Sequence, residues 1–174
     1  EETCAERDAS VRCSPVLAAD AKARPAALPR VWLYCANTLG SAPKFDPGVV
    51  AFTPGATLEL LVDTRLADAA AEAAGAAASR PVEVSLTYLA SFESMGRVEV
   101  QCAPASGCRC APVRVDAHLP PREGERAISA HMSHALNVHG EAEACRIRLR
   151  VDEATSSGGH KFKLLQLSVG RGAS

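Results

Sequence analysis

Apolar and polar side chains alternate along most of the chain, which is the pattern of extended structure. The clearest example is residues 81–91, whose apolar positions are Val82, Val84, Leu86, Tyr88 and Ala90. Successive side chains of a β-strand point to opposite faces, so this stretch predicts a strand with one buried and one solvated face. Residues 98–102 and 146–151 repeat the pattern, because aliphatic residues alternate there with charged or polar ones.

Other segments predicted to be strands are residues 31–35, 49–52, 57–62, 127–138 and 161–169. In the last of them, Leu164-Leu165 shifts the alternation and predicts a β-bulge. Turn-forming residues separate the segments: Asp46-Pro47-Gly48, Thr53-Pro54-Gly55, Ser94-Met95-Gly96, Pro120-Pro121, His139-Gly140 and residues 156–159. Many short strands without intervening helices predict an all-β fold, an antiparallel β-sandwich that is jelly-roll-like.

The chain has 174 residues, which is enough for one domain and too few for a two-domain enzyme. We expect the sandwich to occupy residues 31–170, with a short tail at 171–174. Residues 1–30 contain several prolines and little periodicity, which predicts an N-terminal strap or linker. Residues 66–80 are alanine-rich and have almost no large side chain to bury, so we predict a surface loop insertion there rather than a packed helix.

Seven cysteines are spread along the sequence: Cys4, Cys13, Cys35, Cys102, Cys108, Cys110 and Cys145. Structural zinc sites use paired C-x2-C knuckles, whereas this chain has the C-x-C sequence Cys108-Arg109-Cys110. The spacing therefore favours disulfides over a metal cluster, and disulfides persist in oxidising compartments. We predict a disulfide-stabilised protein of the extracellular space or cell surface, reached through the secretory pathway.

Neighbouring cysteines of a C-x-C sequence rarely bond to each other. We therefore expect one of Cys108 and Cys110 to pair with Cys102 and the other with Cys145. The remaining three cysteines lie near the N-terminus. An odd number leaves a free thiol, a bond to a partner chain, or a mate in sequence outside these residues, and we favour the last.

Charge and hydropathy exclude two classes of partner. The formal net charge of -1 provides no positive field for a polyanion, so we expect no nucleic-acid binding. No apolar run approaches the roughly 20 residues needed to cross a bilayer, so we expect no membrane insertion. The first residues, Glu1 to Cys4, do not form a signal peptide, and we expect either a mature secreted product or an excerpt.

Catalytic chemistry has weak support in the sequence. Neither G-x-S-x-G nor G-D-S-L occurs, so no serine nucleophile is recognisable. Asp116 and His118 resemble part of an acid–base pair, but the sequence shows no serine for them to act on, and surface roles are favoured. We expect this chain not to be an enzyme and to need no cofactor.

Metal binding is also disfavoured. His131, His134 and His139 have ligand-like spacing only if the segment is helical, whereas its alternation predicts a strand that sends the first two to opposite faces. We expect no metal site. Asp63 and Arg65 are expected to form an internal ion pair at the end of a strand, a structural role rather than a ligand site.

Sugar recognition normally uses an exposed aromatic ring beside polar groups, and aromatic residues make up only 4% of this chain. Trp32 and Tyr34 are expected to serve the core. Phe92 lies beside a turn and has even odds of being exposed. The candidate carbohydrate-binding residues are Tyr88, Phe92, Glu93 and His160.

Several motifs occur in an order that resembles a known family. They are residues 62–65 (VDTR), 86–96 (LTYLASFESMG), 100–102 (VQC), 107–110 (GCRC), 145–148 (CRIR) and 156–163 (SSGGHKFK). This arrangement resembles the C-terminal β-rich, cysteine-containing domain of plant and green-algal SGNH-hydrolase-type (GDSL-like) extracellular proteins. The resemblance covers about residues 31–170, and the alanine-rich insertion, Cys4 and Cys13 match nothing in it.

The resemblance implies that any enzyme domain lies upstream and carries the catalytic residues, so none can be transferred to this chain. The positions that match are Tyr88, Glu93, Gly96, Cys102, Cys108, Cys110, Cys145 and His160, with Phe92 where an aromatic residue is expected. We therefore expect a non-catalytic recognition module for cell-wall or cell-surface polysaccharide or glycoprotein. The alternatives are a structural subunit of an extracellular assembly with neighbouring chains, or an accessory domain of an SGNH-type carbohydrate esterase.

Overall fold

The computed structural model describes residues 13–15, 30–38, 44–65, 81–121, 123–124 and 126–171. In these residues the chain forms strands and no helix. The strands are β1 (Cys13–Pro15), β2 (Leu33–Thr38), β3 (Lys44–Ala51), β4 (Thr57–Val62), β5 (Val82–Ala90), β6 (Arg97–Cys102), β7 (Val113–Asp116), β8 (Ala130–Val138), β9 (Cys145–Val151) and β10 (Phe162–Arg171). Within this described part, no helix is long and apolar enough to span a membrane.

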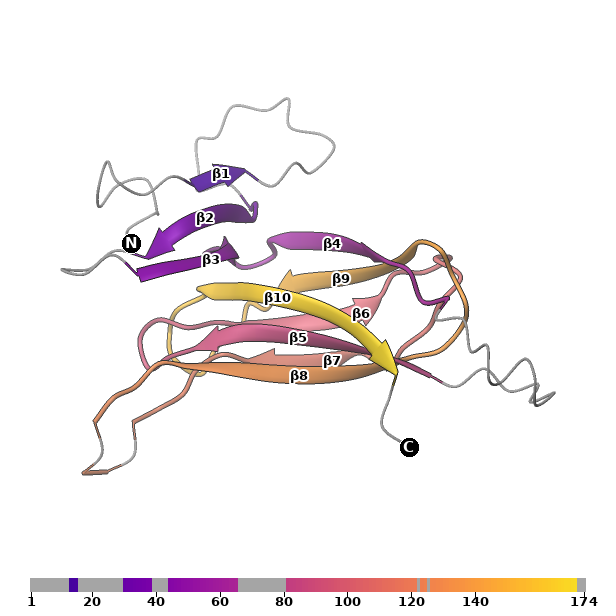
Figure 1. Ribbon diagram of the computed structural model, residues 1–174. Helices are drawn as coiled ribbons and strands as arrows, with labels where there is room; N and C mark the ends of the chain where they lie inside the picture. The colour runs from indigo at the N-terminus through magenta and orange to yellow at the C-terminus, as the bar shows by residue number, and fades with distance from the viewer. Residues whose placement is uncertain are drawn as a thin grey trace.

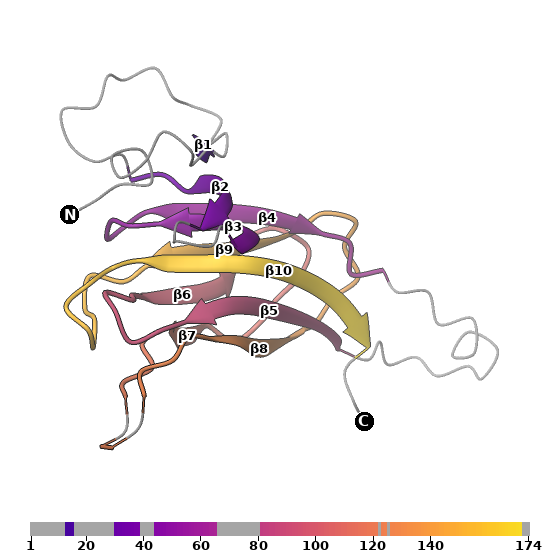
Figure 2. The same cartoon turned by 60° about the vertical axis from the view of Figure 1, so that its left-hand side comes forward.

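The strands form two antiparallel sheets that lie face to face (Figures 1 and 2). Sheet A has six strands in the order β1-β2-β3-β10-β5-β8, and sheet B has four in the order β4-β9-β6-β7. From β3 to β10 the chain crosses between the sheets in the order of a jelly roll, whose eight strands divide into two four-stranded layers. The prediction of an all-β, jelly-roll-like sandwich is confirmed, and β1 and β2 extend sheet A at the β3 edge.

The core lies between the sheets and follows the alternation of the strands. In β5 every second residue is buried, and β9 has the same pattern, with its arginines on the outer face of sheet B. Three rings fill one part of the core: Phe162 stacks on Tyr88 with ring centroids 5.4 Å apart and meets the edge of Trp32 at 6.1 Å. The expectation that Trp32 belongs to the core is confirmed, whereas Tyr34 is exposed.

Two local predictions have opposite outcomes. The bulge at Leu164-Leu165 is confirmed, because the β10–β5 register shifts between Leu164 and Gln166. The turn expected at Asp46-Pro47-Gly48 is wrong, because these residues lie inside β3. The β2–β3 register also shifts there, between Cys35 and Asn37, and a proline within a sheet is tolerated at such an irregularity.

Part of the expected domain organisation falls outside the described residues. This applies to the alanine-rich insertion at 66–80, to most of the strap at 1–30, and to residues 172–174 of the expected 171–174 tail, whose first residue, Arg171, instead ends β10. Within that strap the structure describes β1, which pairs with β2 and places Cys13 opposite Cys35 in the ladder.

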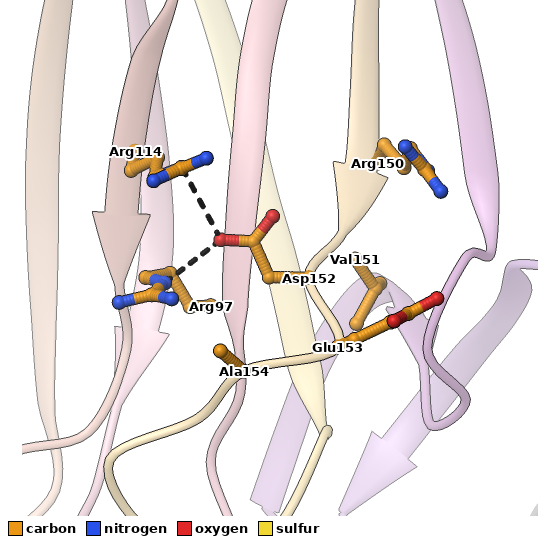
Figure 3. A pocket seen from close by; sticks show the side chains of 7 residues that line it. All are labelled: Arg97, Arg114, Arg150, Val151, Asp152, Glu153 and Ala154. Atoms are coloured by element: carbon orange, nitrogen blue, oxygen red, sulfur yellow. Dashed lines mark hydrogen bonds and ion pairs between the residues drawn. The ribbon is translucent and has the colours of Figure 1, made fainter.

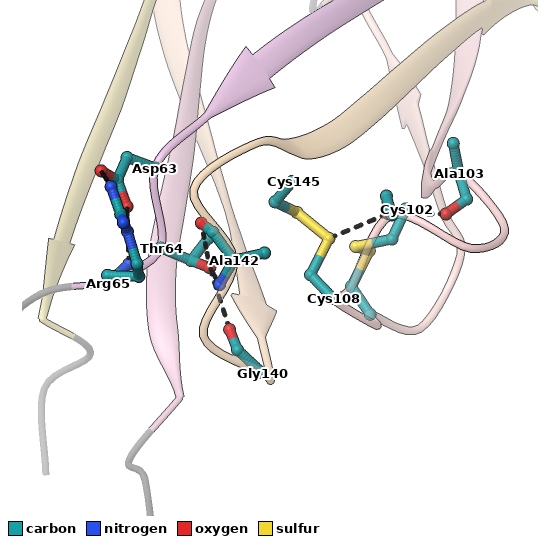
Figure 4. The surroundings of a disulfide bond; sticks show 11 residues. Asp63, Thr64, Arg65, Cys102, Ala103, Cys108, Gly140, Ala142 and Cys145 are labelled. Carbon is teal, nitrogen blue, oxygen red and sulfur yellow. Dashed lines mark hydrogen bonds and ion pairs between the residues drawn. A yellow bond between two sulfur atoms is a disulfide. The ribbon is translucent and has the colours of Figure 1, made fainter.

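The two ends of the sandwich differ and are named here for later use. The disulfide end is formed by residues 63–65 after β4 and by the connections β6–β7 and β8–β9, and it contains the bonds Cys102–Cys110 and Cys108–Cys145 (Figure 4). The expected division of the C-x-C cysteines between Cys102 and Cys145 is confirmed. Cys35 is also disulfide-bonded, to a cysteine whose side chain lies outside the described part. These bonds indicate an oxidising environment.

The loop end is formed by the connections β3–β4, β5–β6, β7–β8 and β9–β10. Backbone hydrogen bonds join these connections to one another: Gly55 donates to the carbonyl of Val151, and Ser91 donates to that of Ala117. No disulfide is present at this end among the residues that the structure describes. In the described residues, the loop end is therefore held by non-covalent interactions: hydrogen bonds, packing and the Arg97–Asp152 ion pair.

Candidate functional site

The β5–β6 and β9–β10 connections pack tightly against each other at the loop end. Gly96 donates a backbone hydrogen bond to the carbonyl of Lys161, and Lys161 donates to that of Ser94. The side chains of Thr155 and Ser157 both donate to the carbonyl of Met95. The sequence candidates from these two segments are therefore brought together.

Glycine is required where these two connections meet. A Cβ atom on Gly96 would lie 2.6 Å from the carbonyl carbon of His160, and one on Gly159 would lie 2.3 Å from the carbonyl oxygen of Ser94. Cβ atoms do not approach other heavy atoms this closely, so no other residue fits without movement of the backbone. These two contacts set the distance between the β5–β6 and β9–β10 connections.

Asp116, His118 and Ser156 form a hydrogen-bonded cluster beside this contact. Ser156 Oγ donates to Asp116 Oδ2 at 2.8 Å and lies 3.1 Å from His118 Nδ1, while the backbone N–H of His118 donates to Asp116 Oδ1 at 2.9 Å. A hydroxyl has one proton, and here it goes to the carboxylate, so Nδ1–H of His118 must donate to Ser156 Oγ. The cluster links the β7–β8 and β9–β10 connections.

The order of groups in this cluster differs from that of a hydrolytic triad. In such a triad the imidazole lies between the serine and the carboxylate, so that it can take the serine proton. Here the hydroxyl of Ser156 lies between Asp116 and His118. The cluster holds the two loops and, because Asp116 is exposed, it presents a carboxylate to solvent for hydrogen bonds with a ligand.

Phe92 supplies an exposed aromatic residue at the loop end. It is 40% exposed, and it follows Ser91, whose backbone forms an isolated β-bridge with His118 of the cluster. Ser91 Oγ is also 2.8 Å from Ser129 Oγ, which ties the β7–β8 connection to the end of β5. Exposed apolar groups continue along β8 and just before it, at Ile128 and Met132.

The other sequence candidates occupy different environments. Tyr88 is only 8% exposed and its ring stacks on Phe162, so the aromatic face of the site is left to Phe92. Burial raises the pKa of the Tyr88 hydroxyl, and the charge of Asp116 raises it further. Glu93 is exposed beside Phe92. His160 is half-buried against Gly96, and its buried Nδ1 has no hydrogen-bond partner among the residues that the structure describes.

The sequence indicated part of this site and missed the rest. Phe92 and His160, which lie on two of its connections, were predicted as candidate binding residues. Asp116 and His118 were assigned surface roles because their serine partner is 38 to 40 residues away in the sequence. A pattern of short polar loops at alternate strand connections was the available signal, since a jelly roll gathers them at one end.

Residues considered for other roles lie outside the Asp116–His118–Ser156 cluster. His131 and His134 lie in β8, which confirms the prediction that this segment is a strand. Residues three apart in a strand point to opposite faces. Asp63 and Arg65 form the expected ion pair at the disulfide end, with 2.8 Å between Oδ2 and Nη2, and Glu143 joins at 3.3 Å. Hydrogen bonds from Arg65 lower the pKa of the Asp63 carboxyl to about 2.

Comparison of the chain with family models, with curated proteins and with solved structures found no match. The fold and the geometry of the site are therefore the basis for a functional proposal.

Proposed function

We propose that this protein is a non-catalytic extracellular or cell-surface module that binds polysaccharide at the loop end. The observation that carries the proposal is the presence at one end of the sandwich of both the exposed Phe92, on the β5–β6 connection, and the Asp116–His118–Ser156 cluster. An apolar ring face packs against the C–H face of a pyranose, while carboxylate, imidazole and hydroxyl groups exchange hydrogen bonds with sugar hydroxyls. The oxidised cysteines support a location outside the cytosol.

The test is calorimetric titration of the folded chain with plant and algal cell-wall glycans. We expect at least one glycan to bind and Phe92→Ala to weaken that binding by about tenfold or more, which is about 1.4 kcal/mol. Leu61→Ala is the matched control, because Leu61 is an exposed apolar residue of β4 at the disulfide end. Absence of heat with every glycan, or equal affinity of wild type and Phe92→Ala, would overturn the proposal.

The non-catalytic part of the proposal has its own test. Acetyl-ester hydrolysis by the isolated chain that is lost in Ser156→Ala would assign a catalytic role to the cluster and reject a purely binding role. A role as accessory domain of an SGNH-type esterase rests on the resemblance of motifs alone.

A second candidate is a structural subunit of an extracellular assembly. It is compatible with the odd number of cysteines, because seven thiols cannot all pair among these 174 residues and a bond to a partner chain is one way to pair the seventh. Electrophoresis without reductant separates the two candidates: a covalent multimer that collapses on reduction favours assembly, and a monomer favours the recognition module.

A further inference from the structure

Arginines line the outer face of sheet B, opposite the core. Arg146, Arg148 and Arg150 alternate with buried residues along β9, and Arg97 and Arg114 lie on β6 and β7. Arg148 is paired, because its Nε and Nη2 both donate to Glu59 Oε1, at 2.9 and 2.7 Å. Among the described residues, Arg150 makes no ion pair.

Three of these arginines surround an open hollow of about 310 Å³ at the end of β9 (Figure 3). Asp152 stands between them, and Figure 3 shows Arg97 and Arg114 on one side of it and Arg150 on the other. Asp152 Oδ2 is 2.8 Å from Nε of Arg97 but 3.7 Å from Nε of Arg114, whose side chain is 65% exposed. The carboxylate therefore engages Arg97 closely and Arg114 only weakly.

The hollow offers more hydrogen-bond donors than its own acceptors use. Each guanidinium carries five N–H donors and no acceptor, and a carboxylate accepts about four hydrogen bonds. Asp152 and Glu153 line the hollow, and Glu99 lies between Arg114 and Arg150 in the strand register. No ion pair joins Glu99 to either arginine within the described part of the chain. Arg114 and Arg150 thus remain available to an acidic group.

The hollow and the candidate glycan site are neighbours in the β6–β7 ladder and along the β9–β10 connection. Arg97 is paired with Asp116 in the β6–β7 ladder, and Asp152 precedes Ser156 by one short loop segment. The backbone N–H of Asp152 donates to the carbonyl of Arg97, which fixes the start of that segment beside β6. A polysaccharide chain that contacts Phe92 and the Asp116 cluster can therefore extend over the edge of sheet B.

We propose that this hollow binds the acidic substituent of a polysaccharide, a uronate carboxylate or a sulfate ester, between Arg114 and Arg150. The proposal rests on the proposed glycan-binding function and names the class of glycan. A carboxylate and a sulfate ester each present neighbouring oxygen atoms as acceptors. A planar guanidinium group can donate two parallel hydrogen bonds to such a pair of oxygens. The net charge of -1 gives the protein no general attraction for polyanions, so recognition depends on these local contacts.

The experiment compares matched glycans and variants by calorimetry. The probes are polygalacturonate, its fully methyl-esterified form, and a sulfated galactan with its desulfated form. We expect wild type to bind at least one acidic glycan about tenfold or more tighter than its neutral counterpart. The pair of acidic probes then distinguishes the carboxylate from the sulfate as the source of the charge.

The variant Arg114→Gln/Arg150→Gln should remove this preference and leave binding of the neutral glycan unchanged. Arg146→Gln is the control, because Arg146 is an exposed arginine on the same strand and face but outside the hollow. Arg150→Lys keeps the charge without the fork, and we expect it to lose most of the preference. Thermal unfolding followed by circular dichroism verifies that each variant is folded.

The outcomes separate the two proposals. Equal affinity for acidic and neutral glycans, or a preference that survives in Arg114→Gln/Arg150→Gln, overturns the acidic subsite while the glycan-binding function stands. Absence of any glycan binding overturns both. Equally tight binding of single-stranded DNA that also depends on Arg150 would identify a general polyanion contact and overturn the specificity for glycans.

Discussion

The disulfide end and the loop end close the same pair of sheets with different chemistry. At the disulfide end, two covalent bonds, the buried Thr64 and the Asp63–Arg65–Glu143 ion pairs join residues 63–65, the β6–β7 connection and the β8–β9 connection. At the loop end, close glycine contacts and hydrogen bonds between exposed side chains hold four connections together. The two ends therefore differ in what they contribute: the disulfide end stabilises the fold, and the loop end presents groups that are available to a ligand.

The largest expected effect concerns the covalent bonds. Replacing both cysteines of Cys108–Cys145 by serine should lower the free energy of unfolding by about 4 kcal/mol, against about 2.5 kcal/mol for Cys102–Cys110, because the bond that closes the longer loop restricts the unfolded chain more. The sequence separations are 37 and 8 residues. Urea unfolding measures both values. The three proteins should become equally stable in excess reductant, and a larger loss from the short loop would contradict the expectation.

At the loop end, the strongest test is Gly96→Ala. Its methyl group would meet the backbone of His160, and overpacking of this kind costs typically 1–3 kcal/mol. Gly170→Ala is the matched control, since a Cβ there meets nothing within 4 Å. We expect Gly96→Ala to be destabilised and Gly170→Ala to unfold like wild type. Equal stability of the two variants would show that the loop contact does not support the fold.

Thr64 tests the polar part of the disulfide end. Its side chain is 1% exposed, donates to the carbonyl of Gly140 at 2.9 Å, and accepts from the N–H of Ala142 at 2.9 Å. Thr64→Val keeps the shape but leaves that N–H without its partner, which costs about 1–3 kcal/mol. Thr64→Ser retains the hydroxyl and should recover most of the loss in the same unfolding assay.

The smallest expected effect is on pH dependence, through Asp63. The folded-state pKa is about 2, below the ordinary value of 3.8, because Arg65 hydrogen-bonds to the ionised form. The contribution of ionised Asp63 to the free energy of unfolding is therefore complete above about pH 4 and is lost as the pH falls toward 2. An NMR titration of the Asp63 carboxyl should show the lowered pKa in wild type and a value near 3.8 in Arg65→Gln. A pKa near 3.8 for Asp63 in wild type would show that the Asp63–Arg65 ion pair does not form in solution.

Most strands could be predicted because each carries its own alternation. The segment expected at 57–62 is β4 without change, and that at 81–91 contains β5. β7 was missed because it has four residues of which only Val115 is buried, too few to show a period. The Asp46-Pro47-Gly48 turn was wrong because its residues favour a turn locally, while pairing of β3 with β2 and β10 outweighs that preference.

The candidate site was harder to predict, because it depends on distances that only the fold creates. The C-x-C rule was sufficient to expect that Cys108 and Cys110 bond to different partners. No local rule brings Ser156 to His118 and Asp116, since the jelly-roll crossing of β8 and β9 joins them. Phe92 stood out as a loop aromatic in a chain poor in aromatics, whereas the arginine hollow requires the alignment of three strands.

The Cys108–Cys145 bond also has a mechanical consequence. It encloses β7 and β8 in a covalent loop, so a force applied to the two chain ends bypasses these strands. At about 3.4 Å per residue, a separation of 37 residues removes about 125 Å from the length to which the oxidised chain can be stretched. Under tension, one edge strand of each sheet, β8 and β7, is thereby kept out of the stretched path until a reductant cuts the bond.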